Sequence, residues 1–599
     1  MHRLAGWLGH DGIDAVQTLE RMLSKCNVAR PANAHADAHM GVAANLPLAL
    51  EGPLAAIITG RPRFESPEFK DMPAANALLT LWKRHGKDAP KHIHGNFALA
   101  VLDKQENSVF LALDRIGAEK LAFAPSHHGV VFASQADMVA AHPMVGHSLN
   151  AQGIFNYLYF FQVPAPGSLF NGVEKLLPAQ WAQWKQGEVT RGFYWALRYR
   201  DEPRQDFDEQ SRHFHALLRD SVARAIGNDD VAAFLSGGTD SSTVGGVLKE
   251  LTGKAKTYSI GFDAQGFDEI QYARIAAERF GLDLQVYYLQ QADIMEAIPV
   301  LARHYDEPFA NESAIPTYFC AKLAAADGFK AMLAGDGGDE IFGGNERYAK
   351  QKVFEAYYLV PELLRKGLIE PLTHLPGMAA IPPVRKAQSY IRQANIPLPE
   401  RMESYNYIYR QPLDEMFNAD FLKQVNPDIP GQWLKEVYDR ADSDSFLNRM
   451  LHLDLKFTLA DNDLRKVGGM TEAAGINVRY PLLDDAMVDF SGEVPPDWKV
   501  KGQYLRWFFK KALTGFLPDE IINKSKHGFG LPFGVWAREY APLRERIEDR
   551  LAALKQRDIL RPAYIDRVRG EHMTGHATYF GRAVWQMMAL EEWLAARDL

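Results

Sequence analysis

An apolar run that leads into a loop rich in glycine and serine constrains this 599-residue chain most strongly. Val231–Leu235 has the length and composition of a buried strand, and Ser236-Gly-Gly-Thr-Asp-Ser-Ser242 follows it directly. Two consecutive glycines let the main chain approach a ligand closely. A helix expected from about Asp240 would point its free N–H groups into the same space. The segment is therefore typical of a loop that binds phosphate oxygens, with Asp240 placed to hold a cation beside them.

This loop differs from the two most familiar phosphate-binding motifs. It lacks the lysine of the G-x-x-x-x-G-K-[ST] loop, and the dinucleotide pattern G-x-G-x-x-G is absent from it. An ordinary strand-to-helix turn is the alternative explanation for the two glycines. The additional serines and aspartate favour a nucleotide site in which pyrophosphate lies on the loop.

Strands and helices are expected to alternate through the middle of the chain. The apolar patterns predict strands at 231–235, 256–262, 285–289 and 330–333, and helices at 241–251 and 270–280. Such alternation predicts a parallel sheet covered by helices on both faces, with ligands at the carboxyl ends of the strands. The remaining third is mainly helical by periodicity, and we expect its last segment, 584–594, to pack in the core.

The first 190 residues show a different pattern, in which short apolar strands alternate with polar turns. Strands are expected at 96–103, 108–113 and 129–134. A polar and charged stretch from about 199 to 210 separates the two patterns. We therefore expect one domain over residues 1–198 and a second over residues 211–599.

Several blocks of this chain, in the same order, resemble the asparagine synthetases and their relatives, which split ATP into AMP and pyrophosphate. The matching blocks are Ser236–Ser242, Thr257–Phe262, His304–Pro308, Ser313–Pro316, Ala334–Gly344, Val478–Asp484 and Lys524–Gly530. The resemblance implies an α+β N-terminal αββα sandwich, similar to the Ntn hydrolases but degenerate. It also implies a following α/β parallel-sheet domain for adenine nucleotide, with a helical C-terminal part.

The resemblance also implies roles for individual residues. The expected ATP-binding residues are Leu235, Ser236, Gly237, Gly238, Asp240, Ser241, Ser242, Ile260, Ala334 and Gly335. Asp240 and Asp339 would share Mg²⁺ beside the phosphates. Lys526 would reach the α-phosphate, and Asp336 would hold the attacking amine and accept its proton. Together they predict an ATP-dependent, AMP-forming carbon–nitrogen ligase that uses ATP and Mg²⁺.

Two departures from the family's pattern affect the substrates. Relatives read Lys-x-Asp-Arg-Met where this chain has Lys466-Val-Gly-Gly-Met470, so two charges of the acceptor pocket are lost. Glutamine hydrolysis in the family uses Cys at position 2, and this chain has His2. The family's Asn-Gly appears as Thr59-Gly60, and its glutamine-binding Asp is replaced within 72–78. We therefore expect an N-terminal domain without glutaminase activity.

The identity of the amine stays open at this point. One hypothesis is an asparagine synthetase-like enzyme that uses free ammonia, or ammonia from a separate glutaminase. A second is an intramolecular amide-bond synthetase of the β-lactam synthetase or lasso-peptide cyclase type, which uses an amine of its own small-molecule or peptide substrate. A third hypothesis, from another class, is a non-catalytic nucleotide-binding scaffold.

Composition limits the partners and the location. The net charge of −8 and the pI near 6.2 argue against a nucleic-acid partner. The two cysteines, Cys26 and Cys320, cannot form a disulfide framework. We find no apolar run of membrane-spanning length, so we expect a cytoplasmic protein without a membrane partner. Homo-oligomerisation is left open.

Overall fold

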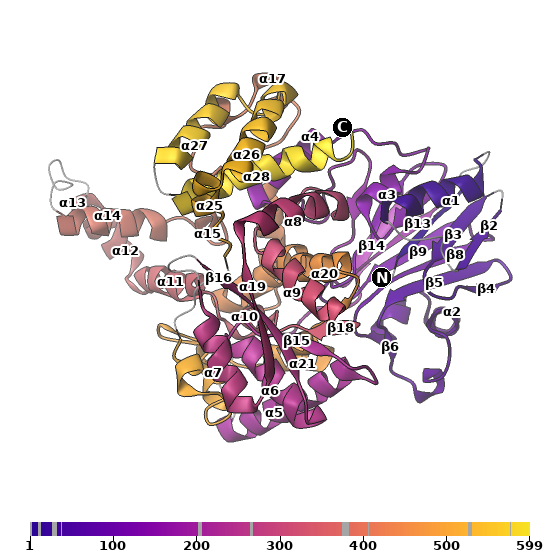
Figure 1. Cartoon of the computed structure of the whole chain (residues 1–599), viewed down its shortest axis with the longest axis horizontal. Coiled ribbons are helices and arrows are strands. Elements are labelled where there is room, and N and C mark those ends of the chain that lie inside the picture. The colour runs from indigo at the N-terminus through magenta and orange to yellow at the C-terminus, as the bar shows by residue number, and fades with distance from the viewer. Residues whose placement is uncertain are drawn as a thin grey trace.

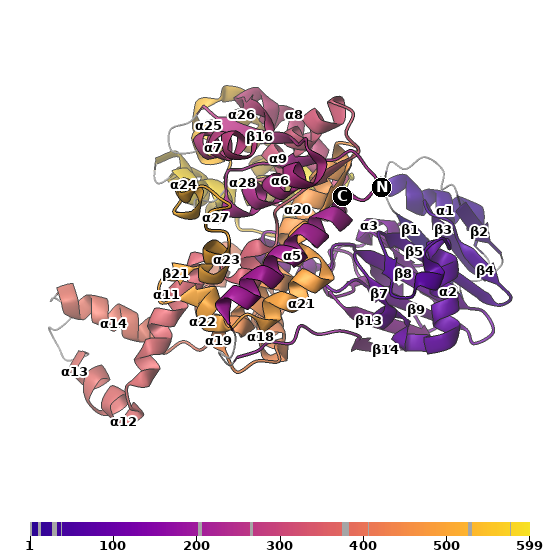
Figure 2. The same ribbon diagram turned by 90° about the horizontal axis from the view of Figure 1, so that it is seen from below.

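The computed structural model describes residues 3–9, 13–26, 33–37, 39–201, 206–263, 268–373, 382–404, 406–524, 530–574 and 577–599. An N-terminal part built on β-sheets lies beside a larger part that mixes a sheet with many helices (Figure 1). The expected succession of a sheet domain and a mixed sheet-and-helix domain is therefore confirmed. Helices α12 (Glu362–Leu364) and α14 (Pro382–Ala394) extend away from the rest of the molecule in both views (Figures 1 and 2).

Two six-stranded antiparallel sheets form most of the N-terminal part within the described residues. The first has the strand order β12-β10-β11-β1-β3-β2, and the second has the order β14-β13-β9-β8-β5-β4. The first sheet consists of β12 (Glu174–Lys175), β10 (Ala122–Pro125), β11 (Val130–Ala133), β1 (Leu4–Leu8), β3 (Met40–Ala44) and β2 (Asn33–Ala36). The second consists of β14 (Glu188–Phe193), β13 (Gln180–Lys185), β9 (Ser108–Leu113), β8 (Phe97–Asp103), β5 (Leu54–Gly60) and β4 (Ala49–Glu51).

The two sheets pack face to face because each strand directs alternate apolar side chains to the shared interior. Val42 and Phe132 from the first sheet join Ile57 and Leu111 from the second in one buried cluster. Helix α2 (Ala74–His85) covers the outer face of the second sheet. Helices α1 (Ala15–Leu23) and α3 (Ala136–Ala140) cover the first sheet.

A five-stranded parallel sheet forms the centre of the second part, in the order β17-β16-β15-β18-β19. Its strands are β17 (Asp283–Leu289), β16 (Lys256–Phe262), β15 (Ala232–Phe234), β18 (Ala331–Leu333) and β19 (Asn477–Arg479). Helices α5 (Phe207–Ile226), α6 (Thr239–Thr252) and α7 (Ile270–Phe280) cover one face. Helices α8 (Gln291–His304) and α9 (Ala314–Ala326) cover the other.

The order of these strands places a crevice at one edge of the sheet. The chain adds β16 and β17 on one side of β15, and it then adds β18 and β19 on the other side. The connections that follow β15 and β18 therefore leave in opposite directions, which opens a crevice at the carboxyl ends of these two strands. Ligands of open α/β sheets bind in such a crevice. The loops that follow these two strands carry both of the motifs singled out in the sequence.

The C-terminal part is helical. A π-helix, η7 (Leu455–Asp463), runs directly into α20 (Leu464–Ala473). The last helix, α28 (Ala577–Ala595), buries Val584, Trp585 and Trp593, so its apolar face packs in the core as expected. Among the described residues, no helix is both long and apolar enough to cross a membrane.

Candidate active site

The loop that joins β15 to α6 depends on glycine at its centre. Gly237 has a φ of +72°, a conformation that favours glycine. A Cβ atom at this position would also lie 2.4 Å from the backbone nitrogen of Ala273 on α7. The loop therefore passes so close to the neighbouring helix that a side chain has no room there.

Hydroxyl groups hold the loop against the first turn of α6. The Oγ atom of Ser241 accepts a hydrogen bond from the Ser236 N–H group at 3.1 Å, and the two Oγ atoms are 3.0 Å apart. Helix α6 starts after Gly238, and no side chain of the described residues caps it. The buried Oγ atom of Ser242 has no partner in the described part of the chain. An uncapped helix start with spare polar groups can bind an anion.

The loop after β18 lies directly against this helix start. The Ala334 N–H group donates to the Arg479 carbonyl on β19 at 2.9 Å, which fixes the start of the loop. A Cβ atom at Gly335 would lie 2.7 Å from the Ser241 nitrogen and 2.8 Å from the Asp240 carbonyl carbon. The structure thus brings the two sequence motifs into contact, and their glycines permit this approach.

Asp240 and Asp339 face the same guanidinium group. Arg506 Nη1 donates to Asp240 Oδ2 at 2.8 Å and to Asp339 Oδ1 at 3.1 Å, and its Nη2 also bonds to Asp240. Burial would lower the pKa of Arg506, but the two carboxylates raise it above its usual value. Because one cation bridges both carboxylates, their positions fit a shared Mg²⁺ ion, whose preferred protein ligands are carboxylate oxygens.

A second polar group surrounds Asp336. Burial raises the pKa of the Asp336 carboxyl to about 6; nearby Asp463 and Asp240 add to the rise, and Lys466 opposes it. Lys466 Nζ donates to Asp463 Oδ1 at 2.8 Å. A carboxyl that titrates near neutral pH can accept a proton from an amine.

The structure locates most of the other predicted ATP-binding residues around the same edge. The Leu235 N–H group donates to the Tyr258 carbonyl on β16 at 2.9 Å, and Ile260 is buried further along that strand. Lys526 and His2 lie outside the described residues. Lys524, the neighbouring lysine, is paired with Glu269 at 2.9 Å.

Comparisons with known proteins agree with this arrangement. A family model described as asparagine synthase matches residues 213–595, and a glutamine amidotransferase domain model matches residues 61–195. The first match covers well over half of the chain. The chain belongs to the asparagine synthase family. Members of this family are ATP-dependent amide-forming ligases, and that class applies to this protein.

Individual relatives of the asparagine synthase family match over most of their length. Glutamine-hydrolyzing asparagine synthetase 1 of Bacillus subtilis is 26% identical over 521 residues, covering 86% of this chain and 80% of that protein. A Methanocaldococcus jannaschii protein, provisionally named glutamine-hydrolyzing asparagine synthetase 2, is 30% identical over 404 residues, covering 65% and 74% respectively. Amidase chry2 of Gibberella zeae is 22% identical over 515 residues, covering 79% and 74%.

Thr59, one of the residues behind the expected loss of glutaminase activity, lies within the described part of this asparagine synthase family member. Thr59, which stands where the family has asparagine, is fully buried in β5. Its hydroxyl group donates to the Ala98 carbonyl on β8 at 3.3 Å. The Thr59 side chain is therefore hydrogen-bonded within the sheet.

Arg479 and Asp484, which belong to the matched block Val478–Asp484, make contacts that support the fold. Arg479 Nη1 donates to the carbonyls of Ala225 and Ile226 at the end of α5, at 2.6 and 2.7 Å. Asp484 bonds to Arg224 of α5 and to Arg63 of the N-terminal domain. Both residues hold α5 in place, and they do not pair with each other.

Sequence reasoning missed two participants in this site. Arg506 precedes α23 (Trp507–Ala512) and belongs to none of the matched blocks, so no local signal pointed to it. Its φ of +56° is unusual for arginine and turns the chain toward Asp240. Asp463 ends η7 three residues before Lys466, and that spacing on a helix was a signal that could have suggested the pair.

Proposed function

We propose that this protein adenylates a carboxylate with release of pyrophosphate and transfers the acyl group to an amine. The observation that carries the proposal is the contact between the loops after β15 and β18, which directs Asp240 and Asp339 toward one cation. Cleavage between the α- and β-phosphates requires that the charge of the leaving pyrophosphate be neutralised. Serine hydroxyls, a helix start and paired carboxylates at one sheet edge support that chemistry.

Each residue has a distinct role in the proposal. The backbone and hydroxyl groups of Ser236–Ser242 bind the pyrophosphate oxygens. Asp240 and Asp339 hold Mg²⁺, which when bound screens the phosphate charges. Lys526 contacts the α-phosphate, as the family resemblance implies. Asp336 holds the amine and accepts a proton as the nitrogen attacks the acyl carbon and AMP departs.

The amine source separates the leading proposal from its alternative. With His2 in place of cysteine, we propose no glutaminase activity, so the first candidate uses free ammonia or ammonia from another enzyme. The second candidate is an intramolecular amide-bond synthetase that uses an amine already present in its substrate. Gly468 and Gly469 favour this candidate, because they line a cavity where relatives carry two charged side chains. A non-catalytic scaffold is the third.

ATP–pyrophosphate exchange and pyrophosphate release test the proposal. The purified protein is given a panel of carboxylates, each with ammonium, with glutamine, or without an added amine. Exchange with any carboxylate supports adenylation, and turnover only with ammonium supports the first candidate. Turnover of an amine-bearing acid without an added amine supports the second. ATP binding with neither exchange nor release across the panel contradicts both and favours a scaffold.

A further inference from the structure

A cavity of about 180 Å³ lies between the N-terminal domain and the synthetase domain. Glu119 and Lys120 line it from the N-terminal domain, and Tyr305, Gly468 and Tyr480 line it from the other side. Water occupies about 30 Å³ per molecule in the liquid, so this space exceeds the size of one ammonium ion. Both domains are needed to form it.

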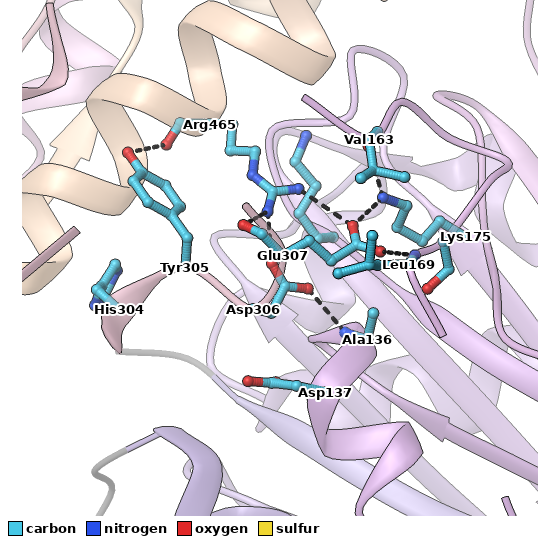
Figure 3. A network of polar contacts seen from close by, with 12 residues as sticks. Ala136, Asp137, Val163, Leu169, Lys175, His304, Tyr305, Asp306, Glu307 and Arg465 are labelled. Carbon is cyan, nitrogen blue, oxygen red and sulfur yellow. Dashed lines mark hydrogen bonds and ion pairs between the residues drawn. The ribbon is translucent and has the colours of Figure 1, made fainter. Parts of the chain in front are cut away.

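Hydrogen bonds and ion pairs at the domain interface form part of the wall of this cavity (Figure 3). Arg465 bonds to Asp306 at 2.8 Å, and the Asp306 carboxylate also accepts from the Ala136 N–H group at 2.8 Å. Glu307, fully buried behind this wall, bonds to Lys175 and accepts from the Leu169 N–H group at 2.7 Å. These contacts fix the two domains relative to each other and occupy the charged groups that make them.

The remaining charged groups of the lining have partners too, with one exception. Glu472 pairs with Arg3, and Asp461 pairs with Lys456 at 2.6 Å. Lys120 Nζ donates to the carbonyls of Gly117 and Ala460 at 2.6 and 2.7 Å. These pairings leave the carboxylate of Glu119 as the exception.

Within the described part of the chain, no hydrogen bond or ion pair reaches the side chain of Glu119. Asp114 fixes the segment by accepting from the Glu119 backbone N–H group at 2.9 Å. The Glu119 Cγ atom would lie 3.1 Å from a Cβ atom at Gly60, so the side chain lies beside the Thr59-Gly60 segment. Burial raises the pKa of Glu119 to about 7; Asp114 and Glu472 add to the rise, and the more distant charges of Arg3 and Lys120 oppose it. Glu119 is partly buried, and a partly buried carboxylate without a hydrogen-bond partner is stabilised by a ligand that supplies one.

Gly468 and Tyr480 form part of the opposite wall of the cavity. A Cβ atom at Gly468 would have the Tyr480 hydroxyl at 3.5 Å as its nearest neighbour, so glycine leaves open space there. Burial raises the pKa of Tyr480, and the charges of Asp336 and Glu119 raise it further. Tyr480 is therefore in electrostatic range of both carboxyl groups.

We propose that this interdomain cavity holds the amine substrate as an organic primary ammonium ion paired with Glu119, before its nitrogen moves to Asp336. This inference rests on the proposed function and specifies the amine. The carboxylate supplies the opposite charge, and Gly468 supplies open space in the same cavity. The degenerate N-terminal domain thus contributes a wall of the acceptor site. Glu188 on β14 serves as the control glutamate, because it is exposed and does not line the cavity.

The first test measures binding and needs no turnover. Saturation-transfer NMR with n-butylammonium is applied to the full-length protein and to its Glu119→Gln, Gly468→Leu and Glu188→Gln variants. We expect the first two substitutions to weaken binding at least 10-fold and Glu188→Gln to leave it unchanged. Equal affinity of the wild type and Glu119→Gln for n-butylammonium would overturn the proposal. A protein that binds ammonium chloride but not n-butylammonium would also overturn it. Glu119→Gln should unfold at the same temperature as the wild type or higher, because it removes an unpaired, partly buried charge.

The second test separates this inference from the proposed function. ATP–pyrophosphate exchange without an amine reports adenylation only, and we expect Glu119→Gln to leave it within 2-fold of the wild type. The KM of the amide-forming step for n-butylamine should rise at least 10-fold. If Glu119→Gln keeps ATP–pyrophosphate exchange and its KM for n-butylamine is unchanged, the amine site is refuted and the proposed adenylation is not. Absence of exchange with every carboxylate refutes the proposed function, and the NMR result then decides the binding site alone.

Discussion

Asp240 and Asp339 accept hydrogen bonds from the same nitrogen atom, Nη1 of Arg506, at 2.8 and 3.1 Å. The two carboxylates come from different loops, and their mutual repulsion would otherwise separate these loops. Arg506 is 6% exposed, so its charge is little screened by solvent. The protein therefore carries an internal counter-ion at the position where the family resemblance implies a metal ion.

Replacement of Arg506 by methionine should destabilise the metal-free protein. Removing one member of a buried ionic group leaves uncompensated charge and costs about 3 kcal/mol or more. We expect the unfolding temperature to fall without Mg²⁺ and to recover partly when MgCl₂ is added, as measured by differential scanning fluorimetry. Arg219→Met is the matched control, because Arg219 forms an exposed pair with Glu250. An unchanged unfolding temperature for Arg506→Met would show that the carboxylates do not need this cation.

Replacement of Asp339 by asparagine should impair adenylation. The substitution keeps the size of the side chain and removes one of two charges that face the candidate phosphate site. Loss of a well-placed electrostatic group costs roughly 100-fold or more in rate. The measurement is ATP–pyrophosphate exchange, with Asp420→Asn as the control, since Asp420 is an exposed residue paired with Lys423. Exchange within 3-fold of the wild type would remove Asp339 from the proposed metal site.

The amide-forming step should depend on pH through Asp336. Its pKa is raised to about 6, and only the ionised carboxylate can accept a proton. The rate should therefore rise about 10-fold per pH unit below pH 6 and level off above it. Amide formation is measured from pH 5 to 8 beside amine-independent exchange. In Asp336→Asn the low-pH limb should disappear, and its persistence would assign it to another group.

Alanine at Gly237 should cost more than alanine at Gly253, although the two glycines share nearly the same φ, +72° and +71°. A Cβ atom at Gly253 meets nothing within 4 Å, whereas one at Gly237 overlaps the backbone of α7. We expect about 1 kcal/mol for Gly253→Ala and about 1–3 kcal/mol more for Gly237→Ala. Urea denaturation measures both. Equal losses would mean that conformation, rather than close packing, explains the glycine at 237.

Replacement of Lys175 by methionine should loosen the interface shown in Figure 3. Glu307 is fully buried and would keep Arg465 as a partner at 3.6 Å. Breaking a buried ion pair lowers the free energy of unfolding by about 3–5 kcal/mol. We expect a loss near the lower end, about 3 kcal/mol, because Arg465 still compensates part of the Glu307 charge. Denaturation followed by tryptophan fluorescence provides the measurement. Lys185→Met, at an exposed pair with Glu106, is the control and should change stability by less than about 1 kcal/mol.

Local patterns predicted the elements around the first loop well. Strand β16 and helix α7 have the predicted bounds, because apolar periodicity over seven to eleven residues is strong evidence for each. Strand β17 begins two residues earlier than expected, at Asp283. Its first residues are partly polar, yet they still pair with Lys256 and Thr257 of β16. Backbone pairing between the two strands therefore extends beyond the apolar residues on which the prediction was based.

Long-range relationships were beyond local patterns. Arg506 reaches Asp240 across 266 positions of sequence, and no motif marks it. Glu119 becomes unusual only because its neighbours in space are already paired. The acidic loop residues Asp240 and Asp339 could be proposed as partners because both follow parallel strands. Their shared arginine required knowledge of how α23 packs on the sheet.

The strand order of the parallel sheet also affects how this protein is made. β18 lies between β15 and β19, and β19 comes from Asn477–Arg479. During synthesis, chains fold from the N-terminus as successive units are completed. The sheet that carries the two loops must wait for a strand near residue 479, long after the N-terminal sheets are available. The N-terminal domain, with Lys175 and Arg63 in place, can then serve as a preformed surface on which the later domain assembles.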